Sequence, residues 1–404
     1  MADAHDPYRA RVAATLTFML TGAVFGAWIP RLPDVKSQLH LSAGMLGLAL
    51  LTPACGALLV MIPVGRLCGR IGSRRITAST FAGFCLFAAV VPWSGSFWLL
   101  AALMLPWGAC IGGCDVAMNA QAVTIERRYG RPILSGFHAW FSIGGIVGAG
   151  IGSIGAAAGI GVGIQQVVVA LAAAAVQGAA SRALLPDAGS RAEAADGAAG
   201  GDGPKHDAAR GRAVLAMLGV ATIAALISEA SASDWSAILL RDTLGASGGT
   251  AGLAFVAFSA TMAAGRLTGD RIVARFGRPQ AVVVLGGGGA AGLAAGFLLD
   301  GIGAVIGGFA VLGIGLAVMF PVAISCAAQA ASAAGSGIAA VTTAGYVAFL
   351  GGPTLIGQLA DHIGLRSTLW LVPGLTALAA VLISLAVAMA ERVVAAGQPV
   401  RQGA

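Results

Sequence analysis

Apolar residues gather in long blocks, and nearly all of the charged residues lie between the blocks. Each block is about 18 to 28 residues long, which is what a helix needs to cross about 30 Å of hydrocarbon. Charged residues make up 10% of the chain and apolar residues 57%, so lipid is the expected solvent for most of it. A flexible Gly/Ala-rich chain is the alternative, but such a chain has no reason to confine its charges to the gaps. We therefore expect an integral membrane protein.

Backbone polar groups find no water partner in lipid, so every block is expected to be a helix. The predicted fold is all-α, with twelve transmembrane helices. The predicted spans lie near residues 12–30, 43–65, 76–93, 98–122, 135–158, 162–184, 213–236, 250–270, 281–299, 303–328, 337–359 and 368–390.

The basic residues predict the orientation. Of the 24 Lys and Arg residues, all but Arg31, Lys36, Arg241 and Arg366 fall on one side of the predicted membrane. Cytoplasmic segments carry the excess of Lys and Arg in membrane proteins, so both termini are expected inside, in a cell (inner) membrane. The net charge of +7 then reflects topology and contact with anionic membrane lipids, and no nucleic-acid partner is expected.

Two stretches 200 positions apart repeat one pattern, Gly65-Arg66-Leu67-Cys68-Gly69 and Gly265-Arg266-Leu267-Thr268-Gly269. Each follows an apolar run and opens a basic patch, as expected of a duplicated helical bundle. Between spans six and seven, residues 186–212 are rich in Ala, Gly, Asp and Arg and lack apolar periodicity. We predict a six-helix bundle over 1–185, a cytoplasmic linker over 186–212 and a second six-helix bundle over 213–404.

Together these features resemble the major facilitator superfamily, whose members consist of two six-helix halves. The family motif after span two reads Gly-x-x-x-Asp-Arg-x-Gly-Arg-Arg, and Gly69 stands here where the family has the aspartate. In the second half Asp270 lies one position late. The resemblance implies that these motifs act in gating. The residues expected to gate are Arg66, Arg70, Arg74, Arg266, Asp270 and Arg271 on the inside, with Arg31 and Asp234 on the outside.

Within the superfamily, the chain is similar to the fucose-permease-like branch and its uncharacterised inner-membrane relatives. The residues that carry this similarity are Asp115, Asn119, Glu126, Gly130-Arg131, His138 and Phe141-Ser142-x-Gly144-Gly145. The branch resemblance implies uptake of a small polar or sugar-like solute.

Asp115 is the first candidate for a proton carrier. It precedes Arg127 by twelve residues, which places it about 18 Å inside the membrane at 1.5 Å per residue. A carboxyl group at that depth tends to face a water-filled cavity or a partner. Asn119 shares its helix face, and His138 on the next span lies at a similar depth. Two interpretations stay open: Asp115 and His138 exchange protons during transport, or they form a fixed structural hydrogen-bonded pair.

Glu229 on span seven is a second candidate for proton coupling or solute binding. The alternative is that Glu229 pairs with Arg31 or Arg241 in an extracellular gate. Asp34 and Lys36, just outside span one, are expected to be solvated loop charges.

Aromatic and neutral polar side chains predict a cavity for an uncharged, hydroxyl-bearing solute. Trp28 and Trp235 are equally compatible with an interfacial aromatic belt, and Gln329 with a helix cap. The predicted solute-binding residues are Trp28, Asn119, His138, Trp235, Gln329 and Tyr346.

Glycine and proline interrupt several spans. The runs Gly144-Gly145-x-x-Gly148 and 286–289 are expected to allow close helix packing, and Pro321 and Pro353 to bend their helices. No metal site or cofactor is predicted, because Cys110 and Cys114 lack a second ligand pair.

We therefore predict a monomeric, proton-coupled symporter working by alternating access on a small-molecule solute. Proton-driven export of a drug-like compound or metabolite is the second possibility, and a transporter-like sensor or binding protein without net flux is the third. An enzyme is not expected, because no nucleophile and base come together in the sequence.

Overall fold

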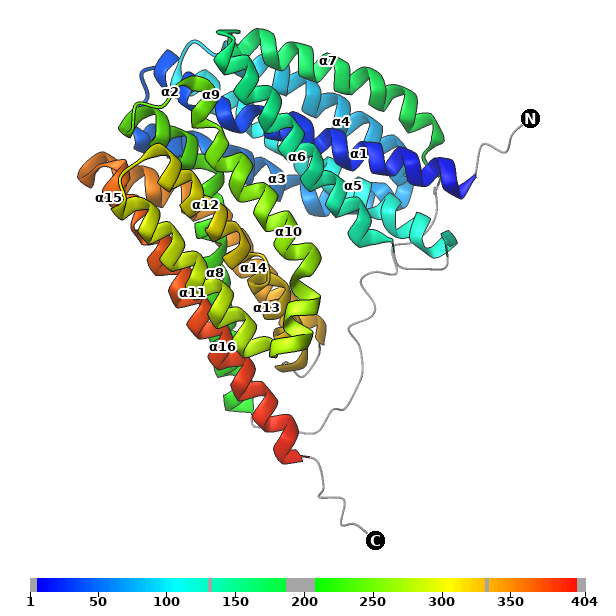
Figure 1. Ribbon diagram of the computed structural model, residues 1–404. Helices are drawn as coiled ribbons and strands as arrows, with labels where there is room; N and C mark the ends of the chain where they lie inside the picture. The colour runs from blue at the N-terminus through cyan, green and yellow to red at the C-terminus, as the bar shows by residue number, and fades with distance from the viewer. Residues whose placement is uncertain (1–5, 130–132, 187–207, 331–333, 398–404) are drawn as a thin grey trace. The chain divides into compact units, whose positions relative to one another are not determined.

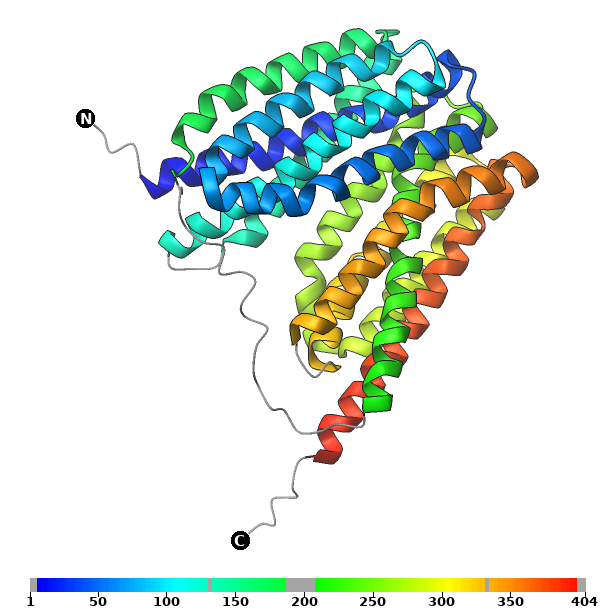
Figure 2. The same ribbon diagram turned by 180° about the vertical axis from the view of Figure 1, so that it is seen from behind.

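The computed structural model describes residues 6–129, 133–186, 208–330 and 334–397 (Figures 1 and 2). All regular structure in these ranges is helical. The long helices are α1 (Pro7–Trp28), α3 (Ala43–Ile71), α4 (Ser73–Val90), α5 (Phe97–Tyr129), α6 (Leu134–Ala157), α7 (Val162–Ala180), α8 (Ala208–Ile238), α10 (Leu253–Phe276), α11 (Arg278–Leu298), α12 (Ile302–Leu316), α13 (Met319–Ala330), α14 (Ala334–Ile363) and α16 (Leu371–Gly397). Short elements include η1 (Ile29–Arg31), α2 (Leu32–Gln38), a π-helical turn η5 (Leu239–Thr243), α9 (Gly248–Ala251) and α15 (Leu365–Leu369).

These helices coincide with the predicted spans. Within the described ranges, 11 helical segments are long and apolar enough to cross a membrane. The predicted span at 337–359 is covered by α14, a 30-residue helix that contains Pro353 and several glycines. The all-α architecture is therefore confirmed.

Several helices are longer than their apolar blocks. α5 continues to Tyr129, α8 begins at Ala208 and α10 continues to Phe276. Their extra turns carry arginines, whose long side chains keep the charged group in water while the backbone stays helical. The predicted linker therefore ends earlier than expected, and its residues 187–207 lie outside the described ranges.

By mutual contacts the chain divides into two compact units. The first unit comprises Met1–Ala192 with Ser233–Ser259 and Pro353–Thr368, and the second comprises Glu193–Ala232, Ala260–Gly352 and Leu369–Ala404. Two segments of the carboxyl-terminal half thus pack with the amino-terminal part of the chain. The division into two six-helix halves stays a prediction.

In the first unit, α1 lies directly along α6 (Figure 1). Glycines on both helices allow this: a Cβ at Gly144 would meet the carbonyl oxygen of Met19, and one at Gly148 that of Ala23. From the other side, a Cβ at Gly22 would meet the carbonyl oxygen of Phe141. The predicted role of this glycine run in close packing is confirmed.

Gly148→Ala is expected to lower the stability of the protein by about 1–3 kcal/mol, because the methyl group would overlap the α1 backbone. Gly150→Ala is the control, since a Cβ there meets nothing within 4 Å. That substitution should leave stability unchanged or raise it by up to about 1 kcal/mol through helix propensity. Thermal unfolding of the purified variants measures both, and equal midpoints would contradict the packing argument.

In the second unit, α11 lies between α12 and α16. A Cβ at Gly286 would meet Met319 and Ala380, and one at Gly289 would meet Gly315, so these two glycines also serve close packing. Pro321 follows the break between α12 and α13, as predicted, because proline cannot donate to the carbonyl group four residues earlier. Pro353 lies inside the continuous helix α14.

Candidate functional site

Asp115 lies on α5 and is half-buried. The side-chain amide of Asn119 donates to Asp115 Oδ1 at 3.1 Å and to the backbone oxygen of Asp115 at 2.8 Å. The predicted sharing of one helix face at i, i+4 therefore produces a direct contact. Asn119 is neutral, so this hydrogen bond does not balance a negative charge on Asp115.

His138 lies on α6, within electrostatic range of Asp115. Its ring meets the edge of Phe18 with the centroids 5.3 Å apart, and its side chain is exposed. Among the described contacts, no hydrogen bond or ion pair joins it to Asp115. The fixed hydrogen-bonded pair, the structural alternative, is therefore not what the structure shows.

A neutral hydroxyl group lies beside Cys114, the residue before Asp115. Thr21 Oγ1 on α1 lies 4.0 Å from Cys114 Sγ. None of the ion pairs formed by the described residues includes Asp115. A buried carboxyl group without a cation partner can be stabilised by binding a proton.

Glu229 on α8 pairs with Arg266 on α10 at 3.3 Å. The alternative partners, Arg31 and Arg241, both bond to Asp34 instead. Because α10 continues to Phe276, Arg266 lies within the helix and not at its end.

A charged cluster forms where η1 and α2 meet η5. We call Arg31, Asp34, Lys36, Arg241 and Asp242 the Asp34 cluster. Asp34 accepts from Arg31 at 2.5 Å and also from Arg241, and Lys36 pairs with Asp242 at 2.5 Å. The expectation that Asp34 and Lys36 are solvated loop charges is wrong. Their partners lie about 200 residues away in the sequence, so no local pattern reveals them.

Arg31 is the most buried member of the Asp34 cluster, with 3% of its surface exposed. Besides Asp34, its guanidinium donates to Gln165 Oε1 at 2.5 Å and to the backbone oxygen of Ile160 at 2.7 Å. Burying an arginine is costly unless charge and hydrogen bonds compensate it, and this network provides both.

Asp34→Asn is therefore expected to destabilise the protein by about 1–3 kcal/mol, because it leaves a buried guanidinium without its counter-charge. Asp242→Asn is the matched control, since it removes one carboxylate from an exposed pair worth at most about 1 kcal/mol. Thermal unfolding at low salt compares the two. A smaller effect for Asp34→Asn than for Asp242→Asn would contradict the assignment.

The first unit also contains a tight crossing of α3 and α14. Ser42 Oγ donates to Asp361 Oδ2 at 2.7 Å, and Thr354 Oγ1 donates to the backbone oxygen of Gly47 at 3.3 Å. A Cβ at Gly47 would meet the backbone of Pro353, and one at Gly357 that of Ala43. This crossing was not predicted from the sequence, although Gly44-x-x-Gly47 after the N-cap residue Ser42 is a signal for close packing.

The predicted solute-binding residues fall in both units. Trp28 and Trp235 are buried inside the first unit, with 4% and 0% of their surfaces exposed, so the interfacial-belt alternative is wrong for both. Trp28 packs edge-on against Trp107 with the centroids 5.8 Å apart. In the second unit Tyr346 is half-buried, whereas Gln329 is exposed near the end of α13 and accepts from Arg278 at 3.3 Å.

Apart from the buried Arg31, the predicted gating residues whose side chains the structure describes are exposed or half-buried. Arg66, Arg70 and Arg271 are exposed, and Arg74 and Asp234 are half-buried. A Cβ at Gly69, where the family motif carries an aspartate, meets nothing within 4 Å. The Asp270 side chain lies outside the described part of the structure.

Comparisons with known proteins agree with this architecture. Residues 14–228 and 213–402 each match the model of the Major Facilitator Superfamily. An uncharacterized MFS-type transporter of Yersinia pestis is 34% identical over 87% of this chain and 89% of its own length. An uncharacterized transporter of Sinorhizobium fredii is 32% identical over 90% and 95% of the two chains.

Solved structures show the same fold at low sequence identity. A point mutant of the nucleoside transporter NupG superposes with a TM-score of 0.73 over 96% of this chain and 100% of its own, at 11% identity. A D-xylose-proton symporter gives 0.70 over 93% and 97%, at 14% identity. Family model, relatives and fold agree, and the chain belongs to the Major Facilitator Superfamily of membrane transporters.

Proposed function

We propose that this chain is a proton-coupled secondary transporter that moves a small polar or sugar-like solute by alternating access. One observation carries the coupling: Asp115 is half-buried on α5, bonded to the neutral Asn119 and unpaired with any described cation. Such a carboxyl group can gain and lose a proton as access to it alternates, with the imidazole of His138 within electrostatic range.

The contacts in the first unit support alternating access. The Asp34 cluster and the α3–α14 crossing join segments of the predicted amino- and carboxyl-terminal halves. From the distribution of Lys and Arg we infer that this end faces the outside of an inner membrane and that both termini are cytoplasmic. We infer that the contacts close the outer mouth and must break when the solute site opens outward.

The solute class follows from the branch resemblance and from the available side chains. Asn119, His138 and Tyr346 offer hydrogen bonds without a fixed charge, which suits a hydroxyl-bearing solute. Among the proteins of the same fold, one is a D-xylose-proton symporter and another a nucleoside transporter. Both names describe solutes with several hydroxyl groups, and this chain is proposed to take a solute of that kind.

A screen of monosaccharides and nucleosides by thermal shift, followed by counterflow in proteoliposomes, tests this proposal. We expect at least one such solute to stabilise the purified protein and to exchange across the membrane. Stabilisation without exchange would contradict transport and favour a sensor. Exchange of amphipathic drug-like compounds alone would contradict the solute class and favour an exporter.

A further inference from the structure

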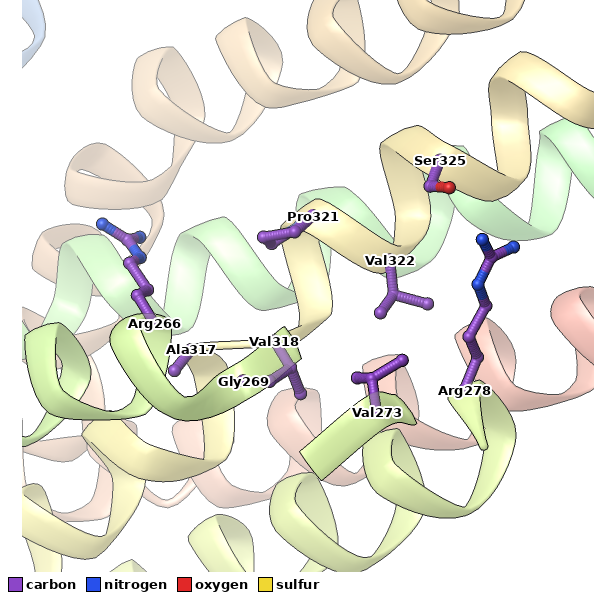
Figure 3. A pocket seen from close by; sticks show the side chains of 9 residues that line it. All are labelled: Arg266, Gly269, Val273, Arg278, Ala317, Val318, Pro321, Val322 and Ser325. Carbon is purple, nitrogen blue, oxygen red and sulfur yellow. The ribbon is translucent and has the colours of Figure 1, made fainter. Parts of the chain in front are cut away.

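A pocket of about 190 Å³ lies within the second unit, between α10, α11 and α13 (Figure 3). Its middle is apolar, with Val273 on α10 and Val318 and Val322 near the start of α13. Pro321 forms part of the wall, at the break that separates α12 from α13. The interruption between α12 and α13 therefore forms part of the pocket wall.

Each end of the pocket carries a guanidinium group, and the two groups differ in whether a carboxylate already balances their charge. Arg266 at one end is paired with Glu229, so its charge is already balanced. Arg278 at the other end donates one hydrogen bond, to the neutral amide oxygen of Gln329. No carboxylate among the described residues pairs with Arg278, and a guanidinium has five N–H donors.

Ser325 lines the pocket at the Arg278 end (Figure 3). A guanidinium and a hydroxyl group beside an apolar channel match an oxyanion that is attached to an apolar body. We propose that this pocket binds an amphiphilic oxyanion, with its phosphate or carboxylate head at Arg278 and Ser325 and its apolar body along Val273, Val318 and Val322. This site is separate from Asp115 and does not depend on the proposed transport.

The ligand has two possible sources with the same chemistry. The predicted orientation puts this pocket toward the cytoplasm, where the leaflet carries anionic phospholipids and the solution carries phosphate esters. An anionic lipid would place only its headgroup and the adjoining part of its chain in the pocket. A soluble amphiphile would bind in the pocket as a whole molecule. The test must therefore separate the two sources.

The test measures calorimetrically the binding of n-hexyl phosphate to the full chain in neutral detergent. We expect saturable binding, and Arg278→Gln should raise the dissociation constant by roughly tenfold or more, because a charge-assisted hydrogen bond is lost. Val322→Phe, which fills the middle of the pocket, should weaken binding as well. Arg275→Gln is the matched control: it removes one exposed arginine that stacks on Phe276 and does not line the pocket.

Equal losses for Arg278→Gln and Arg275→Gln would show general charge attraction and overturn the proposal. Unchanged binding in Val322→Phe would overturn it as well. Gel filtration and unfolding midpoints confirm that the variants are folded, and Ser325→Ala replaces Arg278→Gln if that variant is not. In nanodiscs, loss of n-hexyl phosphate binding when phosphatidylglycerol is added identifies a lipid as the natural occupant. Unchanged binding in those discs identifies a soluble amphiphile.

Discussion

Asp115→Asn should abolish solute uptake driven by an imposed proton gradient and leave counterflow exchange intact. Asparagine has nearly the same shape and can still accept the hydrogen bond from Asn119, but it cannot carry a proton. Gradient-driven uptake needs a group that loads on one side and unloads on the other, whereas exchange needs only the conformational change of the loaded protein. The measurement is solute uptake into proteoliposomes, made once with an imposed proton gradient and once as counterflow exchange.

The control for this variant is Asp300→Asn, which removes an exposed carboxylate in the turn between α11 and α12. It should keep both modes of transport. If Asp115→Asn lost exchange as well as uptake, the residue would have a structural role. If the variant kept gradient-driven uptake, another group would carry the proton, and Glu229 would be the next candidate.

Cross-linking Ser42→Cys to Asp361→Cys should stop all transport, including counterflow. These side chains are in direct contact, with Ser42 Oγ 2.7 Å from Asp361 Oδ2, so a short cleavable thiol reagent can bridge the two cysteines. In the proposed mechanism α3 separates from α14 at this end during each cycle. A covalent bridge would hold the outer mouth closed, and cleavage of the reagent should restore flux.

Single-cysteine variants treated with the same reagent are the controls. The protein without either substitution, treated in the same way, shows whether reaction of its native cysteines affects flux. Cys55 and Cys110 are half-buried and the other four are buried. Full flux in the cross-linked protein would mean that this crossing does not open, and the proposed gate would lie elsewhere.

The membrane fold could be predicted from the sequence because lipid imposes a simple rule of length and polarity on each span. The positions of the helices followed from the apolar blocks, whereas their ends did not. α5 and α10 continue past Arg127 and Arg275, because an arginine at a membrane boundary is compatible with helix. Close packing at Gly144 and Gly148 was also predictable from the small-residue pattern.

Contacts within one helix were predictable and contacts between distant segments were not. The Asp115–Asn119 contact follows from a spacing of four residues. By contrast, Asp34 bonds to Arg241, and nothing near either residue indicates the other. The burial of Trp28 and Trp235 likewise depends on which helices surround them, because an aromatic ring near a span end suits both a belt and a protein interior.

The most direct test of the proposed mechanism is solute uptake into proteoliposomes as the imposed gradient is varied. The protein should concentrate its solute when a proton gradient is imposed, in buffers with or without sodium. Uptake that follows a sodium gradient and ignores pH would contradict the role of Asp115 as the proton carrier.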